Sequence, residues 1–153
     1  DLAELDAWTF EVFFRAEEIR QAVLLRKTEG TEATGYQLLI EGSSGRLYFR
    51  AENDGKYAAL RSPSNSPLES DRWYHVALTW EGETLRMYLN GTVTTSVSYT
   101  EGLSDTTGHL GIGALVRKTD LSDWGQMFYG HLGEIRISNR ALHPAEFMGA
   151  DAF

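Results

Sequence analysis

A chain of 153 residues with 12% aromatic residues and 15 glycines is expected to form one β-rich domain that buries roughly 70% of its unfolded surface. Its net charge of −8 disfavours nucleic acid and anionic membranes as partners, and leaves neutral ligands, cations and basic surfaces open. It lacks cysteine and any apolar run near the roughly 20 residues of a membrane helix, which excludes disulfides, thiolate metal sites and membrane insertion.

Alternating apolar and polar residues predict antiparallel strands in the first half of the chain. In the segment 8–16 every second residue from Trp8 is apolar, and Phe13 on the opposite face indicates a second layer over the outer side. The loop 62–70 holds two of the three prolines, so we expect a crossover or a rim there. Further strands are expected at residues 21–29, 36–42, 46–53 and 57–62.

The segment Arg72–Gly91 predicts a complete β-hairpin. Val76, Leu78 and Trp80 alternate with smaller or polar residues, and the same period of two resumes at residues 85–89. The pair Asn90-Gly91 accepts the positive φ angles of a tight turn, so a third antiparallel strand should follow at once.

The second half of the chain contains three more strand candidates, at residues 94–100, 109–116 and 128–138. Gly111 and Gly113 share one face of the second candidate, which indicates close approach by another part of the chain. In the third candidate the apolar residues change parity, and a β-bulge near Gly133-Glu134 would return both sets to the core.

A short helical turn is predicted at the C-terminus, because Pro144 suits the first helical position. His143 would occupy the cap, Glu146 would close a capping box and Phe147 would anchor the turn. With about ten to twelve strands and frequent turn signals, the whole chain is expected to be all-β, as an antiparallel two-sheet sandwich.

Three segments together resemble the laminin-G-like branch of the concanavalin A-like lectin/glucanase superfamily. They are WTFEVFFRA at residues 8–16, RWYHVALTWEGETLRMYLNG at residues 72–91 and FYGHLGEIRISNRALHPAEF at residues 128–147. The chain departs from the family pattern at Gly133, where the family often has Asp, and at His143, where it often has Ser. The resemblance spans residues 8–147 and implies a single jelly-roll domain over residues 1–153.

The resemblance also implies a function. Relatives are usually accessory modules of secreted or surface proteins that bind glycans or proteins and often hold calcium. The chain starts at Asp1 without Met or a signal peptide, as expected of a piece of a larger protein. We therefore expect an extracellular or cell-surface, carbohydrate-binding or adhesion module. The alternatives are a protein-interaction or structural spacer domain and, third, a glycoside hydrolase.

Catalysis is not indicated by the residues. A retaining glycosidase of this superfold needs two carboxylates about 5 Å apart, which relatives take from a Glu-x-Asp-x-x-Glu run. The nearest piece here, Glu52-Asn53-Asp54, lacks the second Glu and is equally explained as a solvated strand end. The four histidines are scattered, with His75 on the outward face of its strand, so we expect no enzyme.

Sugar binding requires an exposed aromatic ring that stacks on the sugar and polar groups for its hydroxyls. Trp124 is the best candidate, since no alternation buries it, with Asp123 beside it. Tyr57, Tyr129 and Tyr36 are further candidates at strand starts. The alternatives are that Trp124 anchors its loop and that the tyrosine rings are packed.

A structural calcium ion is the one cofactor that the sequence suggests. Calcium takes six to eight oxygen ligands, commonly including two or more carboxylates, and Asp120 and Asp123 lie three residues apart in one loop. The alternative is that these acids only cap turns.

Overall fold

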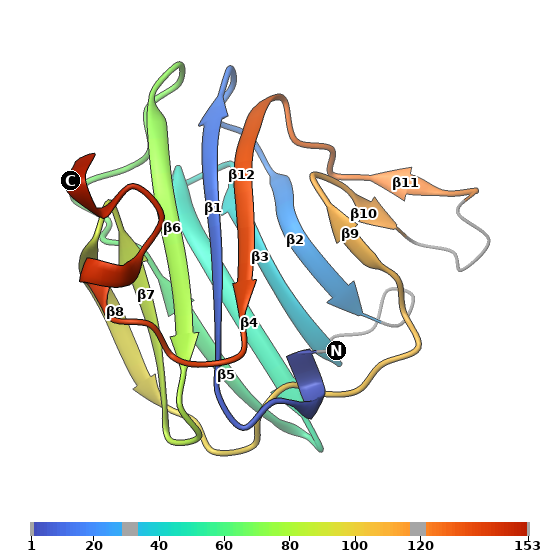
Figure 1. The fold of residues 1–153 in the computed structure, drawn as a ribbon. Coiled ribbons are helices and arrows are strands. Elements are labelled where there is room, and N and C mark those ends of the chain that lie inside the picture. The colour runs from blue at the N-terminus through green and yellow to red at the C-terminus, as the bar shows by residue number, and fades with distance from the viewer. Residues whose placement is uncertain (1, 29–33, 117–121, 153) are drawn as a thin grey trace.

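Two antiparallel sheets pack face to face in the computed structural model, which describes residues 2–28, 34–116 and 122–152 (Figure 1). The first sheet contains β1 (Trp8–Ala16), β6 (Trp73–Trp80), β7 (Thr84–Leu89), β8 (Thr92–Ser98) and β12 (Gly130–Ser138). The second contains β2 (Ala22–Thr28), β3 (Gly35–Glu41), β4 (Arg46–Asn53), β5 (Lys56–Arg61) and β9 (Leu110–Ile112). A short ladder joins β10 (Leu115–Val116) to β11 (Trp124–Gly125).

The strand orders are β12-β1-β6-β7-β8 in the first sheet and β5-β4-β3-β2-β9 in the second. The predicted all-β sandwich is confirmed, as are the hairpin β6–β7 and the third strand β8. Asn90 and Gly91 have φ angles of 49° and 76°, which are those of the predicted tight turn. The loop 62–70 connects β5 of the second sheet to β6 of the first, so it is a crossover.

The core lies between the sheets and is built by the inward residues of each strand. Trp8 contacts both Phe49 of the second sheet, with 6.3 Å between ring centroids, and Trp80 of the first, at 6.5 Å. The indole N–H of Trp80 donates to the carbonyl of Tyr99 at 2.7 Å, so its polar atom is satisfied although the ring is buried. The rings of Trp8, Trp80 and Phe49 therefore join the two sheets.

The predicted bulge in β12 is present where β12 pairs with β1. Val12 lies opposite Ile135 and Phe14 opposite Leu132, so Gly133 and Glu134 together face the single residue Phe13. A Cβ atom added to Gly133 would lie 3.1 Å from the Cβ of Phe13. This close approach leaves little room for a side chain at position 133.

The C-terminal segment forms two single 3₁₀ turns, η2 (Pro144–Glu146) and η3 (Ala150–Ala152). The backbone N–H of His143 donates to the Glu146 carboxylate at 2.9 Å, and Phe147 is buried, as predicted. A third turn, η1 (Leu2–Glu4), lies near the N-terminus. No helix in the described part of the chain is long and apolar enough to cross a membrane.

This C-terminal segment is the second layer predicted from Phe13. It lies over the outer face of the first sheet, where Gly149 packs on the Phe13 ring and Phe147 packs beside His75. The outward face of the first sheet is therefore covered at its centre: His75 of β6 and Glu11 of β1 are fully buried, whereas Trp73 at the start of β6 is 49% exposed. His75 lies on the outward face of its strand, as predicted. The sequence did not predict that the C-terminal segment buries it there.

Glu11 is the polar centre of this covered face. Its carboxylate interacts with His75 Nε2 at 3.1 Å and accepts hydrogen bonds from Arg136 Nε at 2.6 Å and the Met148 backbone N–H at 2.7 Å. Burial raises the pKa of Glu11, but the hydrogen bonds from His75, Met148 and Arg136 and the Arg136 charge outweigh it and lower the pKa overall. Glu11 therefore links β1, β6, β12 and the C-terminal turn as an ionised group.

Removing this carboxylate should destabilise the protein strongly. Glu11→Ala leaves Arg136 and His75 without their buried partner, so we expect a loss of about 3 kcal/mol or more in the free energy of unfolding, measured with urea. The matched control is Glu18→Ala, because Glu18 is an exposed acid that pairs with the exposed Arg20 at 3.6 Å and its loss should cost less than about 1 kcal/mol. Equal effects of the two substitutions would refute the central role of Glu11.

The contribution of the ionised Glu11 carboxylate should also make the free energy of unfolding depend on pH. The pKa of Glu11 lies below 4.5 in the folded protein and returns to about that value in the unfolded chain. Its contribution is therefore complete above pH 4.5 and is lost as the pH falls through the folded pKa. The gap in unfolding free energy between wild type and Glu11→Gln should narrow from pH 5 to pH 3, and a widening gap would contradict this.

Candidate functional site

A polar cleft lies at one end of the sandwich, where the edge strands β5 and β8 of the two sheets approach each other. Its volume is about 400 Å³. Asp54 and Gly55, with φ angles of 49° and 74°, form the tight β4–β5 turn on one side. The cleft is lined by Gly55, Lys56, Tyr57, Ser98, Tyr99, Thr100 and Glu101.

Charged groups bridge the cleft between its two sides. Lys56 Nζ contacts Glu101 at 2.8 Å, and the Asn53 side chain donates to the Glu101 carbonyl at 2.7 Å. The hydrogen bond from Lys56 lowers the pKa of Glu101, and Glu101 in turn raises the pKa of Lys56. Burial raises the pKa of Tyr99 to about 12, so its hydroxyl stays neutral beside the pair. The cleft thus offers both a charged donor and a charged acceptor at its surface.

Tyr57 is the exposed aromatic residue of this cleft. Strand alternation directs Ala58 and Leu60 into the core, which places Tyr57 on the outer face with 65% of its surface exposed. The Arg50 guanidinium lies 4.9 Å from the centroid of its ring. This cation–π contact restrains the ring, so Tyr57 can serve as a stacking surface.

The outer face of the second sheet continues from Tyr57 toward β2. Pairing sets Tyr57 beside Glu52, and the next row across the sheet is formed by Ala59, Arg50, Gln37 and Arg26. In the row beyond it, Arg61 lies over the ring of Tyr48, 4.2 Å from its centroid. The cleft therefore opens onto a face of planar polar and aromatic side chains.

The other sequence candidates lie elsewhere. Tyr129 is 42% exposed, and the Arg20 guanidinium lies 3.6 Å from the centroid of its ring. It precedes Gly130, which pairs with Ala16, so it lies at the end of the sandwich opposite the cleft. Tyr36 is buried, so its ring is packed in the core and cannot be a stacking surface.

The Asp120–Trp124 loop is only partly described. Asp123 is half-buried and precedes β11, where the Trp124 backbone pairs with Val116. Asp120 and the side chain of Trp124 lie outside the described part of the structure. Within residues 2–28, 34–116 and 122–152, no three His, Asp or Glu side chains group as metal ligands. The expectations for Trp124 as a stacking residue and for calcium at Asp120 and Asp123 therefore stay predictions.

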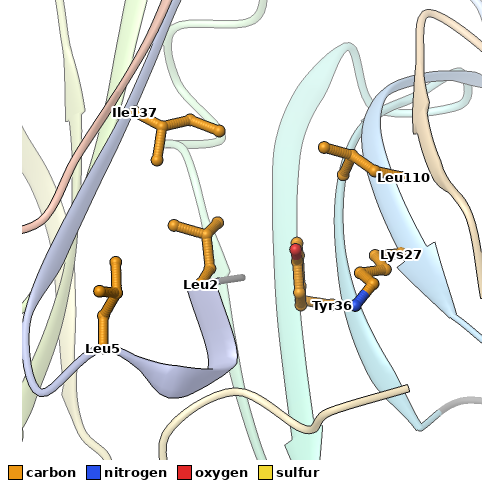
Figure 2. A pocket seen from close by; sticks show the side chains of 6 residues that line it. All are labelled: Leu2, Leu5, Lys27, Tyr36, Leu110 and Ile137. Carbon is orange, nitrogen blue, oxygen red and sulfur yellow. The ribbon is translucent and has the colours of Figure 1, made fainter. Parts of the chain in front are cut away.

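A second cavity of about 320 Å³ opens between the sheets on the side of β9 and β12. Figure 2 shows Leu2, Leu5 and Ile137 on one side of it and Tyr36, Lys27 and Leu110 on the other. Burial raises the pKa of Tyr36 to about 12. Because most of its lining is apolar, this cavity offers few partners for sugar hydroxyls and is a poorer glycan site than the Tyr57 cleft.

A family model described as the concanavalin A-like lectin/glucanases superfamily, of the laminin-G type, matches residues 1–147. The chain belongs to this family. No curated protein matches its sequence. The resemblance predicted from the three segments is therefore confirmed over nearly the whole chain.

Solved structures share the lectin-like fold at low identity. A Bacteroides ovatus protein proposed to bind carbohydrate has a TM-score of 0.70 and 21% identity over 93% of this chain and 40% of its own. The carbohydrate-binding module CBM40 of the Ruminococcus gnavus IT-sialidase, bound to α2,3-sialyllactose, has a TM-score of 0.71 and 18% identity, covering 93% of this chain and 80% of its own. The binding domain of Paraclostridial Mosquitocidal Protein 1 has a TM-score of 0.66 and 18% identity, covering 92% and 35%. The chain thus spans less than two thirds of the length of two of these structures, the Bacteroides ovatus protein and the mosquitocidal protein.

Sequence reasoning found Tyr57 but missed its neighbours in the cleft. Glu101 lies 45 residues from Lys56 along the chain, so no local pattern connects them. Arg50 lies in the predicted strand 46–53 but was not predicted as a site residue. The alternation that exposes Tyr57 exposes Arg50 as well, and this shared outer face was the available signal.

Proposed function

We propose that this lectin-like chain is a non-catalytic carbohydrate-binding module of a larger secreted or surface protein, and that its ligand stacks on Tyr57. One observation carries the proposal: the exposed Tyr57 ring, held by Arg50, borders a polar cleft of about 400 Å³. Sugars present apolar C–H faces that stack on aromatic rings. Lys56, Glu101 and Thr100 then supply donors and acceptors for the hydroxyls.

Two further points support a binding role without catalysis. The structural relatives that share this fold include a carbohydrate-binding module and the binding domain of a mosquitocidal protein. Glu101 in the cleft is bonded to Lys56, and Glu52, which lies beside Tyr57 on the sheet, is bonded to Arg50. The lowered pKa of Glu101 keeps it ionised, whereas a catalytic acid of a glycosidase needs a raised pKa.

Replacing the stacking ring should abolish most of the binding. We expect Tyr57→Ala to weaken glycan affinity about five- to twelvefold, since an aromatic stack contributes about 1 to 1.5 kcal/mol. Isothermal titration with a ligand chosen from a glycan array would measure this. The matched control is Tyr129→Ala, which removes another exposed, arginine-stacked tyrosine at the opposite end. If Tyr129→Ala weakens binding and Tyr57→Ala does not, the proposed site is misplaced.

Binding of a protein is the second candidate function. Leu110 and Ile112 of β9 and Ile137 of β12 are each more than 40% exposed along one side of the sandwich. Exposed apolar residues grouped in this way are typical of protein contact sites. This function is favoured if no glycan on the array binds and if Ile112→Ser weakens the binding of a protein encoded by a neighbouring gene.

We also propose a calcium ion at Asp120 and Asp123, because the sequence places these two acids three residues apart in one loop. If the ion is held there, calcium chloride should raise the melting temperature by a few degrees over magnesium chloride, and Asp123→Asn should remove the increase. Differential scanning fluorimetry measures both. An unchanged melting temperature at millimolar calcium would rule the site out.

A further inference from the structure

We infer that the ligand of this module is an acidic glycan, with carboxylate groups bound by Arg50 and Arg61 on the outer face of the second sheet. The inference rests on the proposed function and adds the chemical class of the sugar.

Charge is distributed unevenly over the protein. The chain carries a net charge of −8, yet the outer face of the second sheet presents four arginines and only two glutamates among the described residues. These side chains alternate with inward core residues along β2 to β5, so all of them point to the same side. They are Arg26, Arg46, Arg50, Arg61, Glu41 and Glu52. An acidic protein thus carries one positively charged face.

The two central arginines are held in place by aromatic rings. Arg50 lies on Tyr57, at 4.9 Å from the ring centroid, and Arg61 lies on Tyr48, at 4.2 Å. Stacking leaves the edge of a guanidinium, where its N–H groups point, available for hydrogen bonds. An arginine that is already oriented loses less conformational entropy when it binds a planar anion, which favours a carboxylate over a neutral hydroxyl.

Both guanidiniums already bind carboxylates of the protein itself. Arg50 pairs with Glu52 on its own strand, and Arg61 Nε donates to Glu41 at 3.0 Å. Each arginine has five N–H donors, and although Arg50 Nε itself is buried, the side chains of Arg50 and Arg61 are 29% and 45% exposed, so a ligand can reach both guanidinium groups. A ligand carboxylate can therefore add to, or replace, the carboxylate of Glu52.

The inference predicts opposite effects for two neighbouring substitutions. Arg50→Gln should weaken binding of the acidic glycan about tenfold or more, because it removes a charge-assisted hydrogen bond. Glu52→Gln should strengthen it severalfold, because it frees Arg50 and removes a competing negative charge. The matched control is Arg20→Gln, which removes the same charge from a tyrosine-stacked arginine in the β1–β2 connection, outside the strands of this face, and should leave binding unchanged.

The probes are three acidic ligands, each paired with its neutral counterpart. They are polygalacturonate with its methyl ester, hyaluronan with its carboxyl-reduced form, and sialyllactose with lactose. Titration calorimetry at 50 and 300 mM salt should show binding of at least one acid in preference to its counterpart, weaker at the higher salt. Melting temperatures of all variants check that each is folded.

The outcomes separate this inference from the proposed function. Equal binding of a neutral counterpart, lost in Tyr57→Ala, overturns the acidic ligand and keeps the carbohydrate-binding module. Acid-selective binding that Arg20→Gln reduces as much as Arg50→Gln overturns the assignment to this face. Binding of none of the six probes, nor of any glycan on an array, overturns both.

Discussion

The buried carboxylate of Glu11 is the constraint on which the arrangement of this sandwich depends. An ionised group with no exposed surface is tolerated only when hydrogen bonds replace its lost hydration, and here His75, Arg136 and the Met148 amide supply them. These partners come from β6, from β12 and from the C-terminal segment. One carboxylate thus connects the central strands of the first sheet and also binds the C-terminal segment through the Met148 amide. In that segment Phe147 packs beside His75 and Gly149 packs on the Phe13 ring.

This cover makes the two sheets functionally unequal. The centre of the outer face of the first sheet is covered by the C-terminal turns of the protein itself, so His75 and Glu11 are structural although their chemistry is that of a catalytic pair. The outer face of the second sheet carries charged and aromatic side chains with partial exposure, and Tyr57 is the most exposed large apolar residue described. A ligand therefore has access to the second face and to the cleft between β5 and β8, which share Tyr57.

Most of the fold could be predicted from the sequence, because apolar residues recur at every second position in a strand with one buried face, and turn residues mark the strand ends. The bulge at Gly133-Glu134 was predictable for the same reason, since a change of parity in an apolar pattern requires an inserted residue. The cover over His75 was only half predictable: Phe13 signalled a second layer, but nothing local identified residues 143–152 as that layer. The site was less predictable still. Tyr57 follows from alternation, whereas the pairing of Lys56 with Glu101 requires that the edges of two sheets meet.

Net charge illustrates the same limit. A value of −8 disfavours anionic partners when charge is spread evenly, and the sequence pattern alone gives no reason to expect otherwise. The arginines of the second sheet are separated by up to 35 positions from Arg26 to Arg61, and only the register of four strands places them on one face. At 0.15 M ionic strength a charge acts over roughly 8 Å, about two strand spacings, so a ligand on this face responds to the local arginines and hardly to distant acids. The chemistry that the module recognises is therefore set by strand register, and the overall charge of the chain governs its solubility.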